Sequence, residues 1–100
     1  MSTPASRTYA RALLEAAGSD AVRVADELDA FAAIATDAPT EWAQLVAPGI
    51  PAAARKSTID RFLADAHVLV RNVLKVLVDN GRLEEATELA AAYRTLVQER

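Results

Sequence analysis

The Asn-Gly pair at positions 80 and 81 most constrains what this chain can fold into. It follows a valine-rich stretch, VRNVLKVLVDNGRL, that runs from Val70 to Leu83. An Asn-Gly pair between apolar runs is typical of a β-hairpin, but it also suits the end of a helix, where glycine takes a left-handed conformation. A hairpin needs a strand on each side of its turn. The choice therefore depends on the conformation of the residues after Gly81.

The segment after Gly81 has the periodicity of a helix. In RLEEATELAAAYRTLVQER the glutamates lie away from one apolar face, which is formed by Leu83, Ala86, Ala90, Tyr93 and Val97. No second strand is then available, so we expect Val68 to Val78 to be helical. Its β-branched residues lower helix propensity by only tenths of a kcal/mol each, which packing overrides. Asn80-Gly81 is predicted to be the left-handed cap of this helix.

Caps and apolar periodicity predict four more helices before residue 67. Thr3 and Pro4 suit the N-cap and first turn of a helix, and Ser19 or Asp20 suits the cap of the next. The six expected helices run from Pro4 to Ala17, from Ser19 or Asp20 to about Thr36, from Pro39 around Trp42 to the segment Ala47–Pro51, from Pro51 to a break near Asp65, from Val68 to the cap at Gly81, and onward from Gly81. The predicted fold is an all-α, six-helix bundle that forms a single domain over residues 1–100.

Composition excludes several classes of function. The net charge is −3, with 14 acidic and 11 basic side chains spread along the chain, so no basic stripe is present to bind nucleic acid. Without cysteine, no disulfide or Cys-based zinc site can form. Arg71 and Lys75 interrupt the longest apolar run, which is also too short to span a bilayer. We therefore expect no nucleic acid and no direct membrane insertion.

No residue pattern indicates chemistry. His67 is the only histidine, and no other ligand-type residues surround it at metal-binding spacing, so a solvated or capping role is expected. Ser19 and Ser57 lack the context of a nucleophile. Arg82 is expected to bond the last carbonyls of the preceding helix. We predict no catalytic residues, no cofactor and no metal site.

Two of the predicted helices carry more apolar surface than a core requires. In the helix 68–79 the apolar arc spans roughly 200°, whereas a surface helix needs little more than 100°. One half of the arc suffices to face a core, and it contains Val70, Leu74, Leu77 and Val78. The surplus half contains Leu69, Val73 and Val76. The helix 4–17 is apolar over about half its circumference.

The surplus apolar surface of these two helices has two interpretations. These helices could be the central ones of a small bundle, covered by the other four. Alternatively, a groove between them could bind a foreign amphipathic helix.

Three segments resemble a known family. RTYARALLEAA (7–17), ELDAFAAIAT (27–36) and VLVDNGRLEEATELAAAYRTL (76–96) are similar to the N-terminal domain of the delta subunit of the bacterial rotary ATP synthase, whose mitochondrial counterpart is the oligomycin-sensitivity-conferring protein. The resemblance implies a six-helix bundle in a non-catalytic stator component. Such a domain binds the N-terminal helix of an alpha subunit and links the catalytic head to the peripheral stalk.

The resemblance also implies which residues bind the alpha-subunit helix. In the family, that helix lies on the first and fifth helices. The matching positions in this chain are Tyr9, Ala12, Leu13, Ala16, Leu69, Asn72, Val73 and Val76. They are largely the surplus positions found from periodicity, which favours the groove interpretation.

Further expectations concern assembly. The family continues into a C-terminal domain that contacts subunit b of the peripheral stalk, and this chain stops at Arg100. We therefore expect an N-terminal domain without its stalk-binding part, a monomer when isolated. Its expected location is the cytoplasmic face of the bacterial plasma membrane, as a peripheral part of the complex. The alternatives are a helical RNA-binding domain and a bundle that associates with itself.

Overall fold

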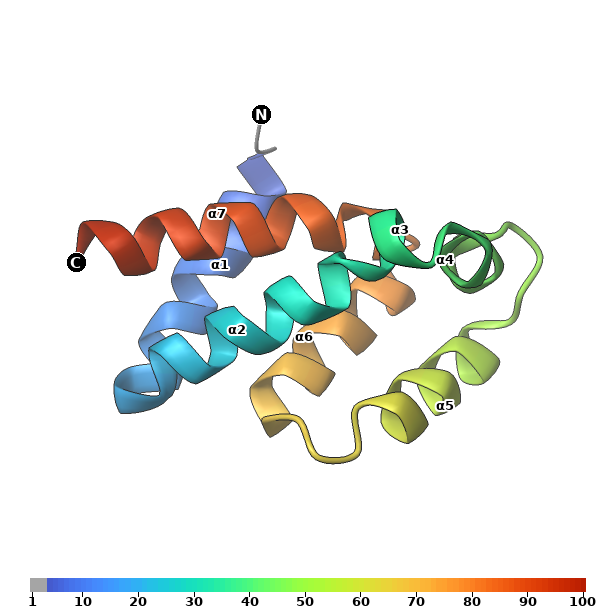
Figure 1. Ribbon diagram of the computed structural model, residues 1–100, viewed down its shortest axis with the longest axis horizontal. Helices are drawn as coiled ribbons and strands as arrows, with labels where there is room; N and C mark the ends of the chain where they lie inside the picture. Colours follow the sequence, from blue (N-terminus) through green and yellow to red (C-terminus); the bar gives the residue numbers. More distant parts are fainter. Residues whose placement is uncertain (1–3) are drawn as a thin grey trace.

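The computed structural model describes residues 4–100, and this part of the chain contains helices and no strand (Figure 1). The helices are α1 (Pro4–Ala17), α2 (Ala21–Ala32), α3 (Ile34–Asp37), α4 (Pro39–Val46), α5 (Ala52–Phe62), α6 (Val68–Asp79) and α7 (Ala86–Glu99). Two 3₁₀ segments, Gly18–Asp20 and Leu83–Glu85, precede α2 and α7. The predictions of an all-α class and a single compact domain are confirmed.

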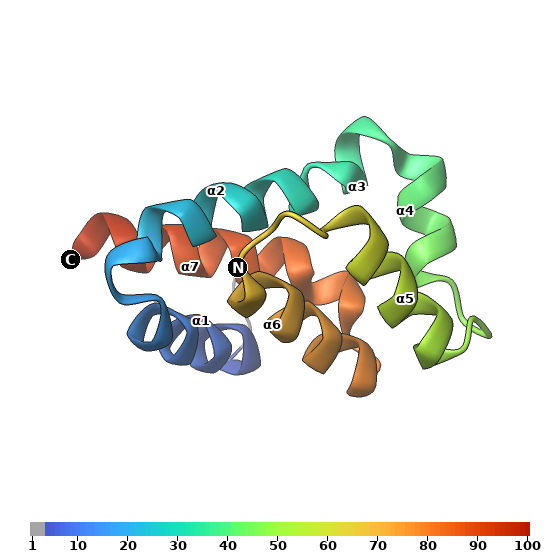
Figure 2. The ribbon, with the colours of Figure 1, turned by 90° about the horizontal axis from the view of Figure 1, so that it is seen from below.

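Helix α7 is at the centre of the packing. It packs along both α1 and α2, while α6 contacts α1, α2 and α5 (Figures 1 and 2). Side chains from α1, α2, α5, α6, α7 and the 3₁₀ segment Leu83–Glu85 form one buried apolar cluster, whose largest fully buried members are Tyr93, Leu28, Ile59, Leu74, Leu83, Leu89, Val24 and Val70. Helices α4 and α5 lie at the end of the molecule away from the C-terminus (Figure 1).

The expected count of six helices is not confirmed. A single helix to about Thr36 was predicted, but α2 ends at Ala32 and the one-turn helix α3 begins at Ile34. The turn lies at Ala33, whose carbonyl accepts from both Thr36 and Asp37. Alanine periodicity continues through this point, so the pattern contains no signal for the break.

Helix α6 ends in a Schellman motif, and the hairpin interpretation is excluded. The Gly81 amide donates to the Val78 carbonyl at 3.0 Å and the Arg82 amide to the Leu77 carbonyl at 2.7 Å. Gly81 has φ +67°, which glycine adopts at low cost. The predicted left-handed cap is thus confirmed at Gly81. Arg82 bonds the helix end through its backbone, whereas its side chain pairs with Glu85.

Three local predictions need correction or fall outside the structure. Asp20 occupies the N-cap of α2 but makes no capping hydrogen bond, because its carboxylate contacts His67 instead. The apolar spacing of Ile59, Phe62, Leu63 and Ala66 predicts a single stripe on the fourth expected helix, yet the Phe62 side chain is 78% exposed, because α5 ends there. The predicted N-cap Thr3 lies outside the described residues.

Tyr93 ties α7 to α2 from within the core. Its side chain is fully buried, and its hydroxyl donates to the Ala21 carbonyl at 2.9 Å. Burial disfavours the phenolate and raises the pKa of Tyr93, an effect that outweighs the opposing charges of Arg100 and Arg94. The folded protein therefore keeps this proton at a pH where the unfolded chain loses it.

The free energy of unfolding is expected to fall as pH rises above about 10, the ordinary tyrosine value, because only the unfolded state releases the proton there. Tyr93→Phe should cost about 1 kcal/mol at neutral pH through the lost hydrogen bond. It should also reduce the alkaline decline. Urea denaturation of both proteins at about pH 8 and about pH 11 checks this. An equal decline in the two proteins would contradict the role given to Tyr93.

Candidate partner-binding site

Helix α6 has one buried apolar side and one accessible apolar side, as its periodicity predicts. Val70, Leu74, Leu77 and Val78 are all at most 4% exposed and belong to the core. Leu69 and Val73 are half-buried against the edge of that core, Asn72 is exposed, and Val76 is 41% exposed. The surplus residues thus reach the surface together.

Helix α1 lies beside α6 and contributes small residues to the same surface (Figure 2). Ala12 and Ala16 are exposed, and Tyr9 is half-buried. Leu13 is only 6% exposed and belongs to the core, so it lies beneath this surface. We use the name α1/α6 face for its accessible residues, which are Tyr9, Ala12, Ala16, Leu69, Asn72, Val73 and Val76.

Polar contacts join the two helices at both ends of the α1/α6 face. At one end the Asn80 side-chain amide donates to the Tyr9 hydroxyl at 2.9 Å. At the other end His67 Nε2 lies 3.0 Å from Asp20 Oδ2. Tyr9, in the first half of α1, meets the residue that follows α6, and Asp20, three residues after α1, meets the residue that precedes α6, so the two helices are antiparallel. We refer to these two interactions as the end contacts.

His67 caps α6 as well as joining it to the segment after α1. Its Nδ1 accepts from the Leu69 amide at 3.1 Å, so in the neutral ring the proton is on Nε2 and is donated to Asp20. Its own backbone amide donates to Glu27 Oε1 at 2.7 Å. The capping role expected for His67 is confirmed. Its partners were missed because they are 40 and 47 residues away in sequence.

Ion pairs join α6 to α5 on the flank of α6 that lies away from the α1/α6 face. Lys56 Nζ lies 2.8 Å from Asp79 Oδ1, and Lys75 pairs with Asp60. The charged side chains Lys75 and Asp79 of α6 are therefore engaged with α5, and the α1/α6 face is apolar except for Asn72 and the Tyr9 hydroxyl.

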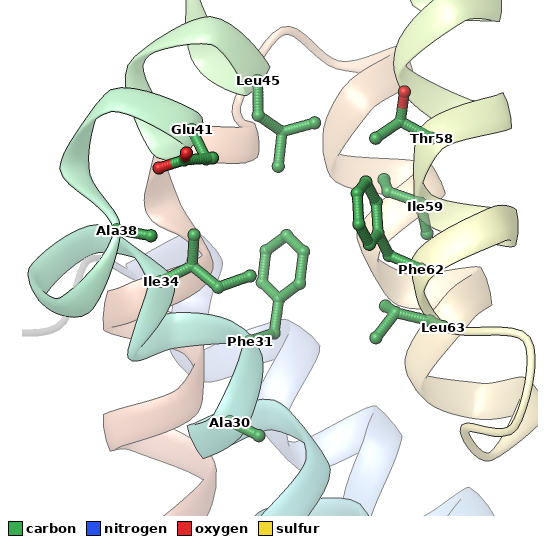
Figure 3. Close-up of a pocket in the computed structure, with 10 residues that line it drawn as sticks. All are labelled: Ala30, Phe31, Ile34, Ala38, Glu41, Leu45, Thr58, Ile59, Phe62 and Leu63. Atoms are coloured by element: carbon green, nitrogen blue, oxygen red, sulfur yellow. The ribbon is translucent and has the colours of Figure 1, made fainter.

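A separate apolar cavity of about 370 Å³ lies between α2 to α4 and α5 (Figure 3). Phe31, Ile34, Leu45 and Ile59 line it, and the exposed Phe62 extends along its edge. No residue of the α1/α6 face borders this cavity. It contains none of the predicted site residues.

The described residues provide no group of three or more side chains that could hold a metal ion. Within the same part of the chain, every helix is too short or too polar to cross a bilayer.

Comparison with protein families decides the identity of the chain. The family model described as ATP synthase delta (OSCP) subunit matches residues 5–100. The chain belongs to this family. No curated protein and no solved structure matches this chain.

Membership of the ATP synthase delta (OSCP) family assigns the chain to a non-catalytic stator subunit of the ATP synthase, a peripheral part of that complex. Two segments used for the resemblance, Tyr-Ala-x-Ala-Leu in α1 and Asn-Gly-Arg-Leu after α6, meet in space. Tyr9 belongs to the first and Asn80 to the second, and the hydrogen bond between them is one of the end contacts. Two distant sequence signatures of the delta-subunit chain thus converge on one end of the α1/α6 face.

Proposed function

We propose that the α1/α6 face binds the N-terminal amphipathic helix of an alpha subunit and thereby links the catalytic head of the ATP synthase to its peripheral stalk. The observation that supports this most directly is the accessible apolar side of α6, where Val76 is 41% exposed beside half-buried Leu69 and Val73. Family membership indicates the assembly in which such a surface would be used, the ATP synthase.

The shape of the face suits a helix. Ala12 and Ala16 on α1 are small and exposed, so a third helix can approach closely between α1 and the taller side chains of α6. From Leu69 to Val76 the face extends about 10 Å along α6, or roughly two turns. An occupant needs apolar residues at i, i+3, i+4 and i+7 to cover it.

The energetics allow a usable affinity. Fully burying an aliphatic side chain such as Leu69, Val73 or Val76 contributes about 1.5 to 3 kcal/mol, and less where the group is already half-buried. Together with the alanines and Tyr9 the gross gain approaches 10 kcal/mol, against an association cost of about 4 to 15 kcal/mol. At the low end of that cost about 6 kcal/mol remains, which corresponds to a dissociation constant of tens of micromolar and suits one contact among several in a stator.

The remaining parts of the proposal concern the larger assembly. The chain would act as the N-terminal domain of the delta subunit, and subunit b would be contacted through a C-terminal domain outside residues 1–100. The complex would hold it at the cytoplasmic face of the bacterial plasma membrane. Isolated, it would be a monomer.

A peptide titration tests the binding proposal. The peptide carries the N-terminal helix of the alpha subunit, and backbone amide chemical shifts of the domain are followed as it is added. The largest shifts are expected along the α1/α6 face, at Ala12, Ala16, Leu69, Val73 and Val76. A scrambled peptide of the same composition should leave them unchanged. Shifts centred on the α4–α5 cavity, or none at all, would refute the proposal.

A further inference from the structure

The apolar cavity between α2 to α4 and α5, which we call the α4–α5 cavity, has an aromatic ring on each of its two sides. Phe31 projects into it from α2, and Phe62 lies opposite on α5 (Figure 3). Trp42 packs edge-on against Phe31, with 5.7 Å between the ring centroids and 70° between the ring planes, and so holds the Phe31 ring in place. An aromatic molecule in this cavity would meet a phenylalanine ring on either side.

The two sides of the cavity are anchored to different parts of the bundle. Helix α5 is held to α6 by the ion pairs of Lys56 and Lys75, and Ile59 fixes it to the core with only 1% of its surface exposed. Helix α4 packs instead on α3, which follows α2. Because each side has its own anchor, the space between them is set by the fold.

The volume of the cavity indicates the size of its ligand. An apolar cavity of about 150 Å³ can hold benzene, so 370 Å³ has room for about 15 non-hydrogen atoms, or two aromatic rings with a short substituent. The lining offers water few hydrogen-bond partners. An apolar molecule therefore displaces water from it at little cost.

The charge at the cavity indicates a cationic ligand. Glu41 is the charged residue among those that line the cavity, and it is exposed on α4. Within the described part of the chain its carboxylate belongs to no ion pair. Arg61, which lies 5.9 Å from the centre of the Phe62 ring, borders a different hollow on α5. A cation at the rim is thus attracted by Glu41, whereas an anion is repelled.

The surroundings of the cavity favour a small molecule over a protein. A stable protein interface buries about 800 Å² on each partner, with an apolar centre. The other large apolar side chains that are exposed in the described residues, Val22, Val68 and Val76, do not line the cavity. Exposed apolar surface here is confined to the cavity and Phe62, and a concave site of this size suits a small ligand.

We propose that the α4–α5 cavity binds a small organic cation that consists of one or two aromatic rings and an amine. The rings lie between Phe31 and Phe62, and the ammonium group pairs with Glu41. This site is separate from the α1/α6 face, since no residue of that face borders the cavity. A bound ligand contacts both sides of the cavity and so connects α4 with α5.

Biphenyl-4-ylmethylamine is a suitable probe for this site. At an ordinary affinity per atom its dissociation constant should be a few tenths of a millimolar. Binding is followed by the fluorescence of Trp42, the single tryptophan, and by backbone amide chemical shifts, which should change most at Ile34, Leu45 and Phe62. Shifts centred on the α1/α6 face, or no binding at millimolar concentration, would overturn the proposal.

A second compound tests the sign of the charge. Biphenyl-4-carboxylate has the same rings and the opposite charge, so it should bind at least about fivefold more weakly than the amine at low salt. Glu41→Gln should weaken binding of the amine about two- to fivefold, and the effect should shrink in high salt. Glu15→Gln, which neutralises an exposed carboxylate on α1, is the matched control and should bind like the parent. Equal affinity of the two compounds would contradict the cationic class.

Phe62→Ala tests the aromatic side of the cavity. The side chain is 78% exposed, so the variant should fold, and loss of the ring contact should weaken binding of the amine about two- to tenfold. Val68→Ala, which shortens an exposed apolar side chain on α6, should leave the affinity unaltered. Unchanged affinity in Phe62→Ala would overturn the proposal. A dimer in sedimentation that Phe62→Ala abolishes would also overturn it, because a second copy would then occupy the cavity.

Discussion

Val76→Asp is expected to weaken binding of the alpha-subunit peptide by at least about 100-fold while the domain stays folded. Val76 is 41% exposed on the accessible side of α6, so an aspartate there remains solvated in the free protein. In the complex its carboxylate would be buried against apolar side chains, which adds a desolvation cost to the lost valine contact. Titration calorimetry measures the affinity, and circular dichroism with urea denaturation checks the fold.

Val22→Asp is the matched control for this substitution. Val22 is 49% exposed near the start of α2, outside the α1/α6 face, so the same change in charge and volume should leave peptide affinity unaltered. If a folded Val76→Asp protein bound the peptide as tightly as the Val22→Asp protein does, the α1/α6 face would not be the binding site.

Leu74→Ala is expected to lower the free energy of unfolding by about 2 to 5 kcal/mol, from lost burial and the cavity left behind. Leu74 is fully buried on the opposite side of the same helix, in the core. For a domain of 100 residues the melting temperature should drop by roughly 10 °C or more. Val76→Ala, only two residues away, should change stability by no more than about 0.5 kcal/mol. Urea denaturation measures the free energy of unfolding of both variants. Comparable losses in the two would contradict the division of α6 into a buried side and an accessible side.

Helix positions in this chain could be predicted because local signals agree with the packing. Pro4 and Gly18 bracket α1, and Gly81 ends α6, since each residue has a backbone preference that suits a helix boundary. The buried side of α6 followed from periodicity alone. The break at Ala33 did not, because it involves no glycine, proline or change of pattern. Phe62 was misplaced because periodicity cannot tell where α5 stops.

The candidate site could be predicted only in part. Periodicity identified Val73 and Val76 as surplus, since spacing alone decides which side of a helix they share. It could not show that Leu13 is covered, because its burial depends on how closely the neighbouring helices pack over it. The end contacts involve residues 47 and 71 positions apart, and nothing local in the sequence pairs them.

The placement of the end contacts has a mechanical consequence. A helix docked on the α1/α6 face, as proposed above, would tend to wedge α1 away from α6 under a sideways load. Had the two helices been joined at one end only, they could be peeled apart from the other, breaking one weak interaction at a time. Tyr9–Asn80 and Asp20–His67 lie at opposite ends, so a sideways load is shared between both contacts and both must yield together. The arrangement suits a component that must bear force without opening.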